Sequence, residues 1–188
     1  AYLQEELYHS RVSTRIDFFM KRQLNPVLKQ MDAAGIAVVD MDNYLLARHA
    51  SEANAHIANV NADPSANAGM TNDEALEYMD AIPANKRQVY ERIANQIDSM
   101  TKETREMMVS YGLEKQGVID SWEHAYKHYV PLMREQDESD TGSLSFGTGK
   151  GYSVKGKTVK ARIGSSKAVV DVLANIALQR ERIIARGE

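Results

Sequence analysis

The sequence predicts a mainly α-helical protein, an irregular helical bundle with a Gly-rich basic arm and a C-terminal amphipathic helix. Three observations lead to this fold class. Apolar residues recur at three- and four-residue intervals along most of the chain, which is the period of an α-helix. Prolines and glycines interrupt this period where helices are expected to end. Residues 139–164 lack the period and contain six of the 11 glycines, so this stretch predicts a flexible arm.

Length and composition indicate how the chain is organised. Its 188 residues suggest one domain with an appendage. We predict a helical body over residues 1–135, the flexible basic arm over residues 136–164, and a helix over residues 165–188 that docks on the body or on a partner. Hydrophobic residues make up 43% of the chain, which excludes disorder throughout. There is no cysteine, which excludes disulfides, and no apolar run approaches the roughly 20 residues of a membrane span.

The N-terminal part of the body predicts one interrupted helix. Apolar residues keep the helical spacing through residues 3–31. Pro26 falls inside this pattern, so we expect a kink or a split near Asn25. Gly35 is a plausible stop. The apolar run at residues 36–39 is interpreted as a buried connector, because no partner strand is evident.

Two further helices are predicted on either side of a loop. Asp40 or Asp42 can cap the first of them, which runs to about Val60. The loop that follows is rich in Asn, Asp, Pro and Gly. Thr71 and Glu74 have the spacing of a capping box, which predicts that a short helix begins there.

The remaining helices are marked by prolines, caps and a glycine. Pro83 can begin a long helix, and Gly112 closes it. The stretch Asp120–Glu123 is interpreted as the cap of another helix, which stops before Pro131. Ser165 is expected to cap the last helix, whose apolar face must pack on something.

A polar stripe follows the helix that starts near residue 40. Tyr44, Arg48, Glu52 and His56 are four residues apart, so they share one face, and His49 borders it. A guanidinium, a carboxylate and two imidazoles suit acid–base chemistry or phosphate binding. The alternative, which we favour, is an intrahelical ion pair beside a partly buried polar seam.

The helix expected after residue 120 contains two histidines and three aromatic residues. His124 and His128 are four residues apart, a spacing that can ligate zinc, but Ala125 occupies the position where a zinc protease has glutamate. No third ligand is evident, so we predict no metal. Trp122, Tyr126 and Tyr129 form an aromatic cluster. Such a cluster can stack bases or hold a peptide, although we favour core anchors with polar tips.

The Gly-rich stretch invites comparison with a phosphate-binding loop. Gly142 and Gly147 have the spacing of that loop, but Thr148 stands where the motif requires lysine, and no apolar strand precedes it. We therefore predict no nucleotide cofactor, and the sequence indicates no other cofactor.

Charge is distributed unevenly along the chain. Residues 139–188 contain nine Lys or Arg and four Asp or Glu, a net charge of +5, whereas the remainder has a net charge of −8. A mobile basic segment can neutralise phosphates without reading sequence. The alternative is a solvated linker. The candidate nucleic-acid-binding residues are Lys150, Lys155, Lys157, Lys160, Arg162 and Lys167.

Five short stretches of the chain form a pattern by their order and spacing. They are Tyr44-Leu-Leu-Ala-Arg48-His49-Ala with Glu52 and Asn54, Gly69-Met70-Thr71 with Glu74, Trp122-x-x-x-Tyr126-x-x-Tyr129-Val-Pro131-Leu with Arg134, Lys160-Ala-Arg162-Ile-Gly164-Ser-Ser-Lys167-Ala, and Asp171-Val-Leu-Ala-Asn175-Ile. Together they resemble a helical domain of the very large polyvalent and giant virion-associated proteins of phages and mobile elements. The chain departs from the usual pattern at Ala53, where arginine is commoner. The helical pattern is already present at Ala1, so we expect a piece of a longer protein.

The resemblance implies a module without an assigned reaction that joins or carries its neighbours during delivery into a host. Its partners would be other domains or chains of a large phage protein assembly, and DNA. Its location would be the virion, or the host cytoplasm after delivery. Two other hypotheses remain open from the residues alone: nonspecific nucleic-acid binding through the arm, and an unrecognised hydrolase that uses the histidines with Arg48 and Glu52.

Overall fold

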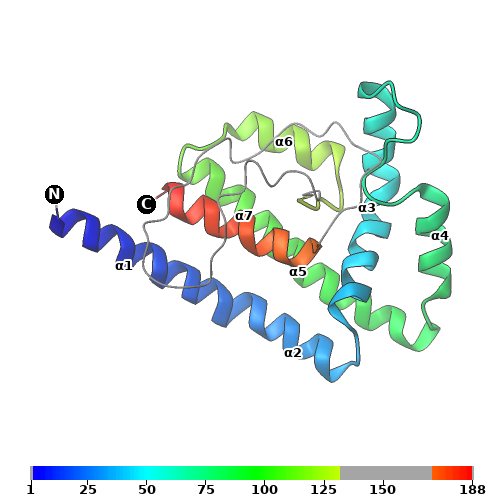
Figure 1. Cartoon of the computed structure of the whole chain (residues 1–188), viewed down its shortest axis with the longest axis horizontal. Helices are drawn as coiled ribbons and strands as arrows, with labels where there is room; N and C mark the ends of the chain where they lie inside the picture. The colour runs from blue at the N-terminus through cyan, green and yellow to red at the C-terminus, as the bar shows by residue number, and fades with distance from the viewer. Residues whose placement is uncertain (1, 132–170, 188) are drawn as a thin grey trace.

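The computed structural model describes residues 2–131 and 171–187 (Figure 1). These residues are mainly helical and include no β-strand, which confirms the fold class at that level. The arm predicted over residues 136–164, its candidate phosphate-binding residues and the Ser165 cap lie outside the described residues. No helix in the described ranges is long and apolar enough to cross a membrane.

The first three helical segments follow one another without a break. The expected interruption near Asn25 takes the form of a π-helical turn, in which the Asn25 N–H donates to the Met20 carbonyl five residues earlier. Pro26 has no N–H to offer the carbonyl four residues before it, and the wider π turn accommodates this loss. The segments are α1 (Tyr2–Phe19), η1 (Met20–Leu24) and α2 (Asn25–Ala33).

The next two helices are α3 (Val38–Val60) and α4 (Asn72–Ala81), which pack against each other. The capping box is confirmed: the Thr71 side chain accepts from the Glu74 N–H, and Glu74 accepts from the Thr71 N–H. The expected cap of α3 is wrong, since Ala37 is the N-cap residue and no side chain caps this end. Asp42 caps a different helix, because its Oδ1 accepts the Leu173 N–H at 3.0 Å.

The last three helices are α5 (Ala84–Ser110), α6 (Gln116–Ala125) and α7 (Val172–Gly187). The predicted start of α6 is wrong, since Lys115 is its N-cap residue and Asp120–Glu123 lies inside the helix. Its predicted end before Pro131 is confirmed, since α6 ends at Ala125. The chain leaves the helix at Tyr126, and the non-helical segment 126–131 runs back towards α3.

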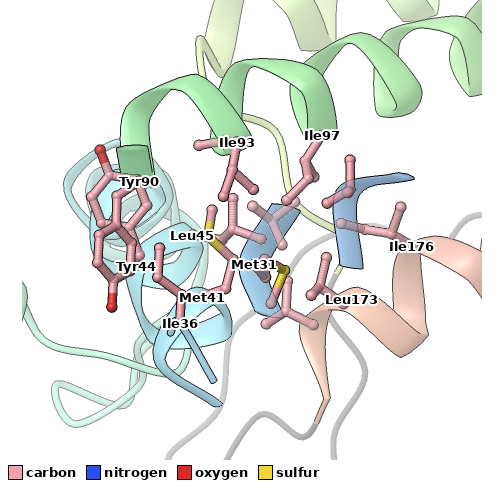
Figure 2. Close-up of a cluster of buried hydrophobic side chains, with 14 of the residues drawn as sticks. Met31, Ile36, Met41, Tyr44, Leu45, Tyr90, Ile93, Ile97, Leu173 and Ile176 are labelled. Carbon is pink, nitrogen blue, oxygen red and sulfur yellow. The ribbon is translucent and has the colours of Figure 1, made fainter. Parts of the chain in front are cut away.

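The main hydrophobic core lies where α2, α3, α5 and α7 converge (Figure 2). Met31, Met41, Ile93, Ile97 and Ile176 are almost completely buried there. Each such side chain contributes roughly 1.5–3 kcal/mol by leaving water. Helix α7 packs against α1, α3 and α5, so residues near both ends of the chain complete one core.

Candidate functional site

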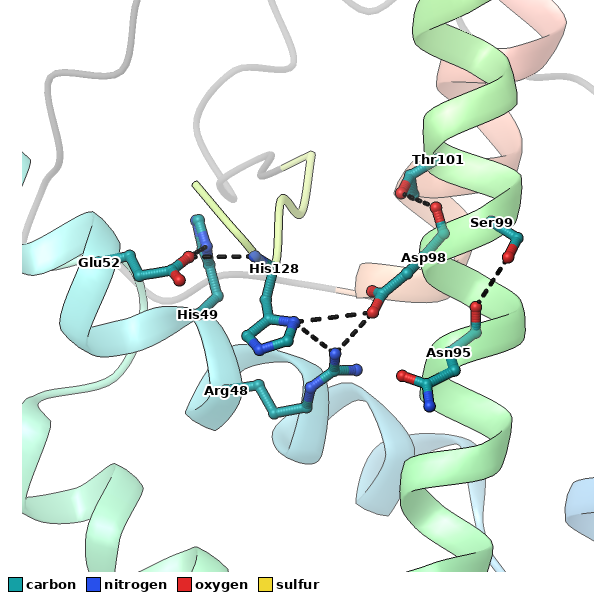
Figure 3. Close-up of polar contacts among 8 residues, drawn as sticks. All are labelled: Arg48, His49, Glu52, Asn95, Asp98, Ser99, Thr101 and His128. Carbon is teal, nitrogen blue, oxygen red and sulfur yellow. Dashed lines mark hydrogen bonds and ion pairs between the residues drawn. The ribbon is translucent and has the colours of Figure 1, made fainter. Parts of the chain in front are cut away.

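Arg48 is the centre of a polar cluster between α3, α5 and the segment 126–131 (Figure 3). Its side chain is only 8% exposed. Its Nη2 donates to Asp98 Oδ2 at 2.6 Å and also contacts Nδ1 of His128. The short charge-assisted bond to Asp98 joins α3 to α5, and the contact with His128 joins both helices to the segment that follows α6.

His128 is half-buried and its Nδ1 lies 3.7 Å from Asp98 Oδ2. Burial lowers the pKa of His128, and the positive charge of Arg48 lowers it further, while Asp98 and Glu52 act in the opposite direction. The net effect keeps the ring neutral at pH 7. A neutral Nδ1 can then accept a hydrogen bond from the Arg48 guanidinium.

Glu52 holds the same segment by its backbone. Its Oε2 accepts the His128 N–H at 3.1 Å and lies 3.9 Å from His49 Nδ1. Burial raises the pKa of Glu52, but the nearby His49 imidazole and the hydrogen bond from the His128 N–H outweigh it, so the pKa lies below its ordinary value. Glu52 is therefore an anion at neutral pH, and it fixes the chain where it leaves α6.

The polar stripe does not form one site. Arg48, His49 and Glu52 belong to the cluster, but Tyr44 packs in the core with its ring 5.1 Å from that of Tyr90. His56 is exposed, and its ring meets the edge of Tyr126 at 6.0 Å.

The two histidines of α6 do not share a helix face. Helix α6 ends at Ala125, so His128 lies outside it, whereas His124 is on its last turn and exposed. Among the described residues, no group of three or more His, Asp or Glu is placed to hold a metal ion.

The aromatic cluster predicted around Trp122 is present and spans α6 and the segment after it. The rings of Trp122 and Tyr129 are nearly parallel, with 6.3 Å between centroids. Tyr126 is buried beside Ile57, and its ring lies 5.4 Å from that of His49. The Arg105 guanidinium lies 5.2 Å from the Tyr129 ring, a cation–π contact that links this cluster to α5.

Asp98 is the cluster member that sequence reasoning missed. A signal was available, since Asp98 shares a face of α5 with Ala94, Thr101 and Arg105, all of which are buried. A charge on a face of small buried residues predicts a charged partner, because an unpaired buried charge is costly. The periodicity alone could not identify Arg48, which is 50 residues away in sequence.

The cluster has the groups of an acid–base site, but they mainly bond one another. His49 is fully buried, so in this conformation it cannot meet a substrate. Among the described residues, Arg48 Nη1 has no hydrogen-bond partner. Comparisons with protein-family models, curated proteins and solved structures give no match to this chain. The family resemblance therefore stays a prediction.

Proposed function

We propose that the chain is a non-catalytic structural and interaction module of a large phage-type multidomain protein delivered with DNA into a host. The motifs around Tyr44 and Trp122 provide the resemblance behind this proposal. One structural observation supports it: the polar residues that a catalytic site would need instead connect separate elements of the fold. Its partners would be other domains or chains of that assembly, in the virion and then in the host cytoplasm.

Among the described residues the same type of connection occurs three times, each time on α5. Arg48 on α3 pairs with Asp98 at 2.6 Å, and Arg105 pairs with Glu123 on α6 at 3.3 Å. Arg180 on α7 pairs with Glu103 at 3.2 Å. All three guanidinium groups are largely buried, and each joins α5 to a different helix. Such a pattern suits a body whose helices must keep fixed positions.

Physical chemistry also favours a structural role for the Arg48 cluster. Breaking a buried ion pair by removing one partner costs about 3–5 kcal/mol, because a charge is left without compensation. Residues retained for chemistry often show the opposite behaviour, since their replacement leaves stability unchanged or raises it. The free energy of unfolding therefore distinguishes the two roles.

A double-mutant cycle on Arg48→Met and Asp98→Asn tests the proposal by urea unfolding. We expect both single variants to lose stability and the pair to show a coupling energy of about 1–3 kcal/mol. The matched control is the exposed pair of Asp17 on α1 and Lys21 on η1, 3.4 Å apart, with an expected coupling within about 0.5 kcal/mol. Variants at Arg48 and Asp98 that gain stability would contradict a structural role.

A second candidate function is nonspecific nucleic-acid binding through the basic arm. The observation in its favour is the net charge of +5 over residues 139–188 beside −8 in the rest. We expect affinity for a labelled DNA duplex to fall by about a thousandfold between about 50 and 200 mM salt if all six phosphate contacts form. Fluorescence anisotropy measures it.

Two sixfold variants with the same loss of charge complete this experiment. The first variant neutralises the six candidate nucleic-acid-binding residues, Lys150 to Lys167, and should lose binding. The second neutralises six exposed basic residues of the body and should keep most of the affinity. Equal losses in both would contradict a site in the arm. The body variant replaces Lys21, Arg22, Lys29, Lys102, Lys115 and Lys127.

A further inference from the structure

A cavity of about 450 Å³ lies between the end of α1, the π turn, and helices α5 and α7. Figure 1 shows α1 running beside α7, with α5 against it. None of the residues that line this cavity belongs to the Arg48 cluster. Its volume is within the range of about 300–1,000 Å³ typical of small-molecule sites.

One part of the cavity wall is apolar and aromatic. Phe19, Tyr111 and Ile184 line it, and Phe18 stands at its edge with 60% of its surface exposed. A large aromatic side chain held in water costs free energy, which a ligand that covers it would recover.

The polar part of the wall centres on Arg180, which is buried. Its Nη2 donates to the Met100 carbonyl at 3.0 Å and to Gln23 at 3.3 Å. Its Nη1 donates to the Met107 sulfur at 2.8 Å, and sulfur is a weak acceptor. Its Nε has no hydrogen-bond partner among the described residues. Two nitrogens of this buried guanidinium, Nη1 and Nε, therefore lack a strong hydrogen-bond acceptor among the described residues.

The charges of the lining favour an anion. Arg15 is exposed, with its guanidinium 5.9 Å from the centroid of the Tyr111 ring, and Arg180 is the second cation. Glu103 is the single carboxylate in the lining, and it already accepts from Gln23 at 2.6 Å and pairs with Arg180. The lining therefore has an excess of positive charge beside an aromatic wall.

We propose that this cavity binds a small amphipathic carboxylate. The apolar body of the ligand lies against Phe18, Tyr111 and Ile184, and its carboxylate faces Arg15 and Arg180. Binding requires no covalent step. The site shares the Arg180–Glu103 pair with the connections on α5, but it includes no residue of the Arg48 cluster, on which the test of the proposed structural function is made. The inference therefore goes beyond that function and can fail without it.

Titration of ¹⁵N-labelled protein with 4-phenylbutyrate, followed by amide chemical shifts, tests the inference. We expect saturable shifts around Phe18, Tyr111 and Arg180, with a dissociation constant on the order of 1 mM. The neutral analogue 4-phenylbutan-1-ol should bind about tenfold more weakly, and butyrate, which lacks the ring, should also lose about tenfold.

Three variants on α1 locate the site without disturbing the buried Arg180. Arg15→Gln should weaken 4-phenylbutyrate about threefold to tenfold and leave the alcohol unchanged, whereas Arg11→Gln, an exposed arginine outside the lining, should change neither. Thr14→Trp places a bulky ring at a lining position, and it should abolish the amide shifts caused by 4-phenylbutyrate and those caused by the alcohol. Shifts that persist in Thr14→Trp, or equal affinity for the alcohol and the carboxylate, would overturn the inference, as would a titration without saturation.

Discussion

Two regions of this molecule place a buried arginine against a carboxylate of α5, yet they differ in what surrounds the pair. Arg48 is enclosed by Asp98, His128 and Tyr44, so its contacts join three elements. Arg180 also pairs with a carboxylate, but it lines a cavity of about 450 Å³. A buried ion pair therefore does not by itself mark a binding site. Each region has one guanidinium nitrogen without a hydrogen-bond partner among the described residues, so the space beside the pair is what distinguishes the second region.

The largest expected effect separates the two carboxylates. Asp98→Ala removes the carboxylate that pairs with Arg48 in the described part of the chain, so we expect a loss of about 3 kcal/mol in the free energy of unfolding. Glu103→Ala should cost about 1–2 kcal/mol, because Arg180 keeps its bond to the Met100 carbonyl and Glu103 is 46% exposed. Urea unfolding measures both, and a larger loss for Glu103→Ala would reverse the comparison.

An intermediate effect is expected at the tip of α7. A Cβ added at Gly187 would overlap the ring of Tyr111, which lines the cavity. Gly187→Ala should therefore cost about 1–3 kcal/mol through displacement of the ring. Differential scanning calorimetry measures the loss, and Gly117→Ala on α6, where a Cβ meets no atom within 4 Å, is the control. Equal transition temperatures in the two variants would show that α7 and the Tyr111 ring move apart at no cost in stability.

The smallest expected effect is a pH dependence confined to the Arg48 region. Burial and Arg48 hold the pKa of His128 below its ordinary value of about 6.5. Between the pKa of the folded chain and that of the unfolded chain, the unfolded chain therefore binds more protons than the folded one. The free energy of unfolding should keep the whole contribution of the neutral His128 above pH 6.5, and it should fall as the pH drops through 6.5 towards the folded-state pKa.

His128→Asn should flatten this decline, which urea unfolding at pH 7.5, 6.5 and 5.5 measures. His124→Asn removes an exposed imidazole and serves as the matched control. A steeper decline in His128→Asn than in the unmodified chain would refute the assignment.

Local sequence predicted the helices but not the site. The Thr71–Glu74 capping box and the core face of α5 follow from contacts three or four residues apart, which a linear pattern records. The residue at which α6 ends does not follow from such a pattern, because the segment after it is held by a hydrogen bond between His128 and Glu52, which is 76 residues away. The sequence predicted that the polar residues of α3 share one face. In the structure they lie in different surroundings, because a different neighbouring element packs against each turn of the helix.

Asp42 has a consequence for how the protein is made. Its carboxylate caps α7 from a position 131 residues earlier in the chain, and Leu173 and Ile176 complete the core built by α2, α3 and α5. Contacts at this sequence separation slow folding, because a long loop must close before they form. During synthesis the earlier helices therefore emerge with an apolar face that α7 covers later. Until α7 leaves the ribosome, that face is exposed to chaperones and to other nascent chains.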